Sequence, residues 1–223
     1  MEDRHSNEPP ESMANPWTEE SYDERYRAHG SLWSGKPNPV LLSETADLAP
    51  GSVLDAGSGE GADAIWLASR GWQVTAVDFS SVALERAAVR ARENAPTLGQ
   101  RITRLHRDLT SWQPSKVDYD LVCAQFLQLA AAQRAVVFGS LAAAVAPGGM
   151  LLIVGHDASD RALGVHRPSR PEVYFTADAI AAQLLEPGAW EVSVSGPRER
   201  TVTSADGQTI VVHDEILRAH RRH

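Results

Sequence analysis

The sequence predicts an α/β fold, a doubly wound and mainly parallel sheet with helices on both of its faces. Three observations support this. Apolar runs of strand length alternate with helical segments from residue 52 to residue 157. A glycine-rich loop, "GSGEG", follows the first of these runs directly. Two strand-like runs with no helix between them close the pattern, so we expect that pair to be antiparallel.

The segment before the first strand is expected to contain two helices. Thr18 suits the N-cap of a helix over residues 18–30, and the turn-rich connector "SLWSGKPNP" follows it. A short helix over residues 39–48 then ends at "APG". Residues 1–16 are acidic, Pro-rich and poor in core-forming side chains, so we expect a disordered tail ahead of a single domain over residues 17–223.

The alternating part of the chain predicts right-handed βαβ units. The expected strands are 52–57, 72–78, 101–108, 118–125 and 150–157. The expected helices are 62–71, 80–95 and 131–146. Gly71 would close the first of these helices, and Ser80 or Ser81 would cap the second. The turn "PGG" would lead the chain into the fifth strand.

After Asp157 the pattern changes. We expect a polar loop over residues 158–174 and a helix over residues 176–185. Two strands should follow at residues 190–196 and 207–220, joined through a turn at Asp206-Gly207.

Composition limits the function classes. The chain has 223 residues, a net charge of −8 and a sequence pI near 5.5, which argues against a nucleic-acid or anionic-membrane partner because phosphate binding rests on clustered Lys and Arg. Its single cysteine, Cys123, precludes an internal disulfide and has the sequence context of a core residue. The sequence has neither a membrane-length apolar run nor a signal-peptide pattern, so we expect a cytoplasmic protein. The histidines lack a metal-ligand spacing, so we expect no metal.

The glycine loop fits two cofactor patterns. Gly57, Gly59 and Ala62 match the dinucleotide fingerprint G-x-G-x-x-G/A. Asp55, Gly57, Gly59 and Gly61 also match a D-x-G-x-G-x-G loop that would hold a methyl donor. In both cases an acid at the end of the second strand would accept hydrogen bonds from ribose hydroxyls, and Asp78 follows Gly57 at the expected spacing.

Three observations favour the methyl donor. A carboxylate at Asp55 would face a pyrophosphate unfavourably, whereas S-adenosylmethionine carries a cationic sulfonium and an ammonium and no phosphate. A hydride-transfer dyad such as Tyr-x-x-x-Lys does not occur in the sequence. The closing antiparallel pair is also unlike the second half of a dinucleotide domain.

On these residues the chain resembles a class I S-adenosylmethionine-dependent methyltransferase from about Trp17 to its end. The resemblance implies a seven-stranded Rossmann-like sheet in the order 3-2-1-4-5-7-6, with strand 7 antiparallel. It also implies that "LDAGSGEG" wraps the methionine part of the cofactor, that Asp78 holds the ribose and that Asp108 lies at the adenine edge. The cofactor-binding residues expected in full are Trp33, Asp55, Ala56, Gly57, Ser58, Gly59, Asp78, Phe79, Asp108, Leu109, Ala124 and Gln125.

Within that superfamily, "YDERY…LWSGKPNP" and the ending "ADGQTIVVHDEILRAHRR" look closest to the small-molecule branch of tellurite-resistance and thiopurine-type methyltransferases. We therefore expect methyl transfer to O, N, S or a chalcogen of a small acceptor, by a monomer or homodimer. Transfer from a sulfonium mainly requires alignment and exclusion of water. His156 follows the fifth strand and is the candidate catalytic and substrate-binding residue. Tyr22 and Tyr26 are candidate substrate contacts within an N-terminal lid over residues 17–48.

Two alternative functions stay open at this point. A catalytically silent cofactor-binding protein could act as a regulator or partner subunit with the same glycine loop. An NAD-dependent reductase would use the dinucleotide pattern of that loop.

Overall fold

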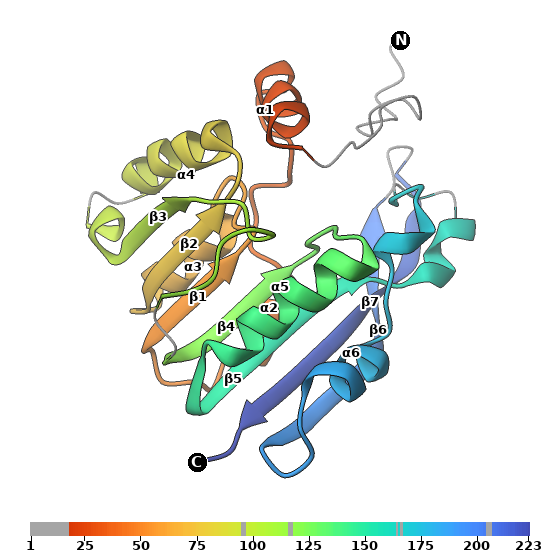
Figure 1. Cartoon of the computed structure of the whole chain (residues 1–223). Coiled ribbons are helices and arrows are strands. Elements are labelled where there is room, and N and C mark those ends of the chain that lie inside the picture. Colours follow the sequence, from red (N-terminus) through yellow and green to blue (C-terminus); the bar gives the residue numbers. More distant parts are fainter. Residues whose placement is uncertain (1–17, 95–96, 116–117, 164, 166, 204–206) are drawn as a thin grey trace.

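A computed structural model describes residues 18–94, 97–115, 118–163, 165, 167–203 and 207–223. Its centre is a seven-stranded sheet in the order β3-β2-β1-β4-β5-β7-β6 (Figure 1). The strands are β1 Ser52–Ala56, β2 Gln73–Asp78, β3 Ile102–His106, β4 Tyr119–Gln125, β5 Val145–His156, β6 Trp190–Thr203 and β7 Thr209–Arg221. Strands β1 to β5 are parallel, and β7 runs antiparallel to both β5 and β6. The predicted fold class, strand order and antiparallel strand 7 are confirmed.

Helices cover both faces of the sheet. They are α1 Glu19–Ala28, α2 Pro39–Glu44, α3 Ala62–Ser69, α4 Ser81–Asn94, α5 Ala131–Ala143 and α6 Ala177–Leu184. Short 3-10 turns are η1 Leu98–Arg101, η2 Ala158–Ala162 and η3 Pro171–Val173. Figure 1 shows α5 and α6 in front of the sheet, and they share a core with Leu54, Val122 and Ile153. Helices α2 and α3 pack on the opposite face with Val53, Cys123 and Leu152.

The helix starts agree with the capping residues in the sequence. The Thr18 side chain accepts a hydrogen bond from the Ser21 amide at 3.2 Å, which caps α1. Of the two candidates for α4, Ser80 is the cap, because its hydroxyl accepts from the Ala83 amide at 3.1 Å. Cys123 is a free, buried core residue as expected.

Three boundaries predicted from the sequence are wrong. The predicted helix over residues 131–146 ends at Ala143, and "PGG" lies inside β5, where the β4–β5 register shifts between Tyr119 and Leu121. The predicted loop over residues 158–174 contains η2 and η3. Strand β6 continues from residue 196 to Thr203, because residues 197–203 pair with β7 and Pro197 is tolerated on an edge strand.

No helix among the described residues is long and apolar enough to cross a membrane. The predicted tail over residues 1–16, Trp17 at the start of the expected lid, and Asp206 of the predicted turn lie outside the described residues.

Candidate functional site

The site lies at the carboxyl ends of β1, β2 and β4. β1 is the point in the strand order 3-2-1-4-5 from which the sheet extends in both directions, and in such sheets a ligand binds in the crevice at this switch point. The register pairs Asp55 with Cys123 and Ala56 with Ala124, so Gln125 ends β4 next to the glycine loop that follows β1. Figure 1 shows α1 beyond this end of the sheet.

The glycine loop has backbone conformations that suit its composition. Gly57 and Gly59 have φ angles of 75° and 51°, in the left-handed region that side chains disfavour. The amides of Gly57 and Ser58 both donate to the Val77 carbonyl, at 2.8 Å and 3.0 Å. These bonds fold the loop over the end of β2 and bring it to Asp78.

Asp78 lies under the loop and is buried. Its Oδ2 accepts from the Gly59 amide and its Oδ1 accepts from the Ser80 amide, both at 2.8 Å. Burial raises the pKa of this carboxyl group, and the backbone hydrogen bonds oppose that rise. A carboxylate has about four acceptor positions, so two backbone donors leave capacity for ribose hydroxyls.

Asp55 is enclosed at the end of β1. It is 2% exposed, and its Oδ1 accepts a long hydrogen bond from the Cys123 thiol, at 3.8 Å. Burial, and then the charges of Asp63 and Asp78, raise the pKa of Asp55 well above its usual range. Asp63 accepts from the Asn38 amide at 2.6 Å, and burial raises its pKa to about 6. Asp55, Asp63 and Asp78 are thus three buried acids with raised pKa values, and such a group favours a cationic group of a ligand.

Orphaned polar atoms surround the same loop. Asp55 Oδ2, Ser58 Oγ and Gln125 Nε2 are buried and have no hydrogen-bond partner among the described residues. Gln125 Oε1 accepts from the Asn38 side chain at 3.0 Å, which orients this amide. Buried polar atoms are rarely left without partners, so these three indicate a polar ligand at the loop.

The remaining predicted cofactor residues divide into two groups. Ala56 and Ala124 are fully enclosed in the core, so only their backbone groups are available to a ligand. Phe79 and Leu109 are half-buried. Asp108 is exposed, and its Oδ1 accepts from the Thr110 amide and hydroxyl, both at 2.8 Å.

Two aromatic side chains of the front segment cover the glycine loop. A Cβ placed on Gly59 would lie 3.3 Å from Tyr26 Oη and 3.6 Å from Trp33 Nε1. The indole N–H of Trp33 donates to Tyr26 Oη at 3.0 Å. Tyr26 is 2% exposed, and burial raises the pKa of its phenol, whereas Trp33 is 45% exposed. The nearby Tyr22 packs against Phe79 with ring centroids 5.2 Å apart.

The sequence analysis missed Glu60, which ties the front segment to the loop. Glu60 is 2% exposed, and its Oε2 accepts from the amides of Leu32 and Trp33 at 3.1 Å and 3.2 Å. The Ser31 hydroxyl donates to the same oxygen at 3.3 Å, and Arg86 donates to Oε1 at 3.1 Å. A glutamate between two glycines resembles a solvated loop residue, so nothing in the sequence distinguishes it.

His156 ends β5 beside a pocket. Its ring stacks on Phe126 at a centroid distance of 4.3 Å and an angle of 24°. The pocket is lined by Phe126, Leu127, Gln128, Gly155, His156, Pro168, Val173, Tyr174 and Phe175. Tyr22 and Tyr26 are not among these residues, so the structure does not bring the three predicted substrate contacts together.

Two other histidines, His213 and His106, have structural partners. His213 Nδ1 lies 2.9 Å from Asp160 Oδ1, and His106 Nε2 lies 2.8 Å from both Glu19 Oε1 and the Phe79 carbonyl. Among the residues whose placement is described, no group of His, Cys, Asp and Glu could hold a metal ion.

The fold and the glycine loop are similar to those of the class I S-adenosylmethionine-dependent methyltransferases. Residues 53–149 match the family model of a methyltransferase domain. The chain is 31% identical over 111 residues to the "Probable thiol methyltransferase 2" of Arabidopsis thaliana, a match that covers 46% of this chain and 48% of the relative. It therefore spans about half the length of this curated relative.

Two solved structures share the fold over nearly the whole chain. One comes from work on the "Conversion of a Disulfide Bond into a Thioacetal Group during Echinomycin Biosynthesis", with a TM-score of 0.70, 24% identity and coverage of 91% of this chain and 92% of that one. The other is the N-methyltransferase NodS from Bradyrhizobium japonicum with S-adenosyl-L-homocysteine, with a TM-score of 0.64, 19% identity and coverage of 92% and 99%. The resemblance inferred from the sequence is confirmed.

Proposed function

We propose that this protein binds S-adenosylmethionine at the glycine loop and transfers its methyl group to a small-molecule acceptor. The observation that carries the proposal is the set of orphaned polar atoms on Asp55, Ser58 and Gln125, arranged around a loop that Asp78 already holds. A relative described as a thiol methyltransferase and a similar fold that holds S-adenosyl-L-homocysteine support it.

The residues present fit this cofactor. The acids Asp55 and Asp63 suit the ammonium of its methionine part, since a cation would relieve the repulsion that raises their pKa values. Asp78 retains acceptor capacity for the ribose hydroxyls. Asp108 and Leu109 follow β3 and are assigned to the adenine edge, and Phe79 to the adjoining ribose.

S-adenosylmethionine supplies a methyl group activated on a sulfonium. The protein's part is to position the acceptor and exclude water. Trp33 and Tyr26 cover the loop from the front segment, which we propose acts as a lid. His156 lines the same pocket as Leu127, and we assign it to hold, or to remove, the proton of a protonated acceptor.

Binding and turnover experiments separate this proposal from its alternatives. Calorimetric titration with S-adenosylmethionine, S-adenosylhomocysteine and NAD should give saturable binding of the first two and none of NAD. Binding of NAD alone would identify a reductase-type site and overturn the proposal. Radiolabelled methyl transfer to a panel of thiols, phenols, amines and tellurite should label at least one acceptor. Tight S-adenosylmethionine binding without any transfer would instead support a silent regulator.

A further inference from the structure

Asn38 connects three elements beside the glycine loop. It is 8% exposed and precedes α2, where its side-chain Oδ1 accepts from the Val40 amide at 2.8 Å. Its own backbone amide donates to Oδ1 of Asp63, in the first turn of α3, at 2.6 Å. Its side-chain Nδ2 donates to Oε1 of Gln125, the last residue of β4, at 3.0 Å. A residue that only capped α2 would need the first of these three bonds alone.

The cap determines which way both side-chain amides point. A backbone N–H can only donate, so the Asn38 atom that meets the Val40 amide must be the oxygen, and its NH2 group is left for Gln125. That NH2 group needs an acceptor, so Gln125 presents Oε1 to Asn38 and turns Nε2 the other way. Nε2 of Gln125 is buried and has no hydrogen-bond partner within the described part of the chain. Its two N–H donors therefore require an acceptor that a ligand can supply.

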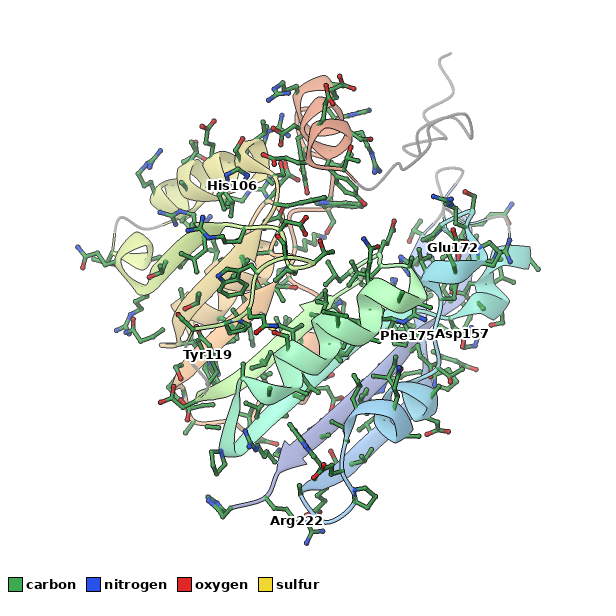
Figure 2. The ribbon with its side chains drawn as sticks, viewed as in Figure 1. His106, Tyr119, Asp157, Glu172, Phe175 and Arg222 are labelled. Carbon is green, nitrogen blue, oxygen red and sulfur yellow. The ribbon has the colours of Figure 1, made fainter. Side chains whose placement is uncertain are left out.

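The strand order indicates which part of the cofactor reaches Gln125. Figure 2 shows Tyr119, the first residue of β4, and Asp157, which follows the parallel strand β5, at opposite ends of the sheet, so Gln125 lies at the Asp157 end. At this end the order β3-β2-β1-β4 gives Asp108, Asp78, the glycine loop and then Gln125. With the adenine assigned to Asp108 and the ribose to Asp78, the amino-acid part of S-adenosylmethionine extends toward β4.

That amino-acid part carries an ammonium and a carboxylate. Asp55 and Asp63 suit the ammonium, since burial raises their pKa values and a cation relieves the repulsion between them. An ammonium has no acceptor atom, whereas a carboxylate has about four acceptor positions, so the N–H donors of Gln125 complement the carboxylate. A carboxylate near two acids also needs such donors, because like charges repel. Asn38 contacts both Asp63 and Gln125, and so orients one partner for each charge.

We propose that Asn38 is a positioning residue for recognition of the methionine carboxylate, an inference that rests on the proposed function. Asn38 fixes the side-chain amide of Gln125 with its NH2 group toward the ligand, and Gln125 donates a hydrogen bond to the carboxylate. Neither side chain gains or loses a proton in methyl transfer. Their effect is to select cofactors that keep the carboxylate and to hold that end of the molecule in place.

Two ligands measure this contact without turnover. Calorimetric titration gives the dissociation constants of S-adenosylhomocysteine and of its decarboxylated analogue, which keeps the amine, the thioether and the nucleoside. The analogue should bind to the wild-type protein at least about tenfold more weakly, because a lost hydrogen bond to a charged group costs about a decade of affinity or more. The ratio of the two dissociation constants cancels any change that affects both ligands alike. Equal affinity of the wild-type protein for both ligands would overturn the inference.

Neutral substitutions show whether Asn38 acts through Gln125. Asn38→Ser keeps a good helix cap but has no NH2 group, so the ratio should fall. Gln125→Met removes both N–H donors and should bring the ratio to about one. In the Gln125→Met background, Asn38→Ser should have no further effect on the ratio, because the two residues act as one unit. Asn94→Ser is the matched control at an exposed position at the end of α4, and it should leave the ratio unchanged.

The outcomes separate this inference from the proposed function. If S-adenosylhomocysteine binds but the ratio is unchanged in folded Asn38→Ser and Gln125→Met proteins, the inference fails and the function stands. If Asn38→Ser does not fold, Gln125→Met still tests the carboxylate contact, since it leaves the cap of α2 untouched. If the wild-type protein binds neither ligand, both the inference and the proposed function fail.

Discussion

Removing the Glu60 carboxylate should release the front segment from the glycine loop. In Glu60→Ala the amides of Leu32 and Trp33 lose a buried, charged acceptor. Hydrogen bonds to charged groups contribute about 1.5–3 kcal/mol each, and the freed amides recover part of this by binding water. Taking the lower end for both amides gives about 3 kcal/mol, or roughly a hundredfold shift toward the open segment.

Hydrogen exchange measures this shift directly. If the amides of Leu32 and Trp33 exchange through local opening, they should exchange roughly a hundredfold faster in Glu60→Ala. Glu60→Gln keeps an acceptor oxygen without the charge and should fall between that variant and the wild type. Glu85→Ala is the matched control, since Glu85 is exposed on α4. Unchanged exchange at these two amides in a folded Glu60→Ala protein would refute the reasoning.

Four further predictions concern the cofactor end of the site. Asp78→Ala should weaken S-adenosylmethionine binding about tenfold or more, and unchanged calorimetric affinity in a folded variant would exclude the ribose assignment. Gly59→Val should abolish that binding while leaving the sheet's circular dichroism intact, because φ is 51° there and Tyr26 Oη would lie 3.3 Å from the new Cβ. The pKa of Asp63 is about 6 in the free protein and should fall beside the ammonium of bound S-adenosylmethionine. Near pH 6 binding should therefore release protons, and the affinity for S-adenosylmethionine should rise from pH 5 to pH 7. Proton uptake on binding, measured by calorimetry in two buffers, would contradict this. Deleting residues 1–16 should leave methyl transfer intact, whereas deleting residues 1–38 should leave the sheet folded but severely reduce transfer, and equal activity of the two truncated proteins would rule out a lid.

The sequence predicted the sheet because its signals were local and repeated. Strand-length apolar runs, Gly71 after α3 and the Ser80 cap each specify a boundary from a few neighbouring residues. The predicted end of a strand was wrong where pairing with a strand far along the chain determines it. Strand β6 continues past Gly196 because β7 is there to pair with residues 197–203, and that partner lies beyond a turn.

The sequence predicted the candidate site only where the site residues belong to a motif of fixed spacing. Asp55, the glycines and Asp78 stand at fixed spacings, so their proximity follows from the fold. The partners of Glu60 lie 27 to 29 residues before it in the chain, and Arg86 lies 26 after it, so no local pattern shows them. The pocket at His156 likewise combines residues that follow β4 with the end of β5 and the loop after it.

The position of β7 has a consequence for synthesis of the chain. Strand β7 follows β6 in the sequence, yet it lies between β5 and β6 and fully buries Ile216 and Leu217. As the protein leaves the ribosome, the edge of β5 therefore stays open until β6 and then residues 209–221 have been translated. Such an edge, with Leu151 to Val154 beside it, is the kind of surface that recruits chaperones or pairs with a neighbouring nascent chain.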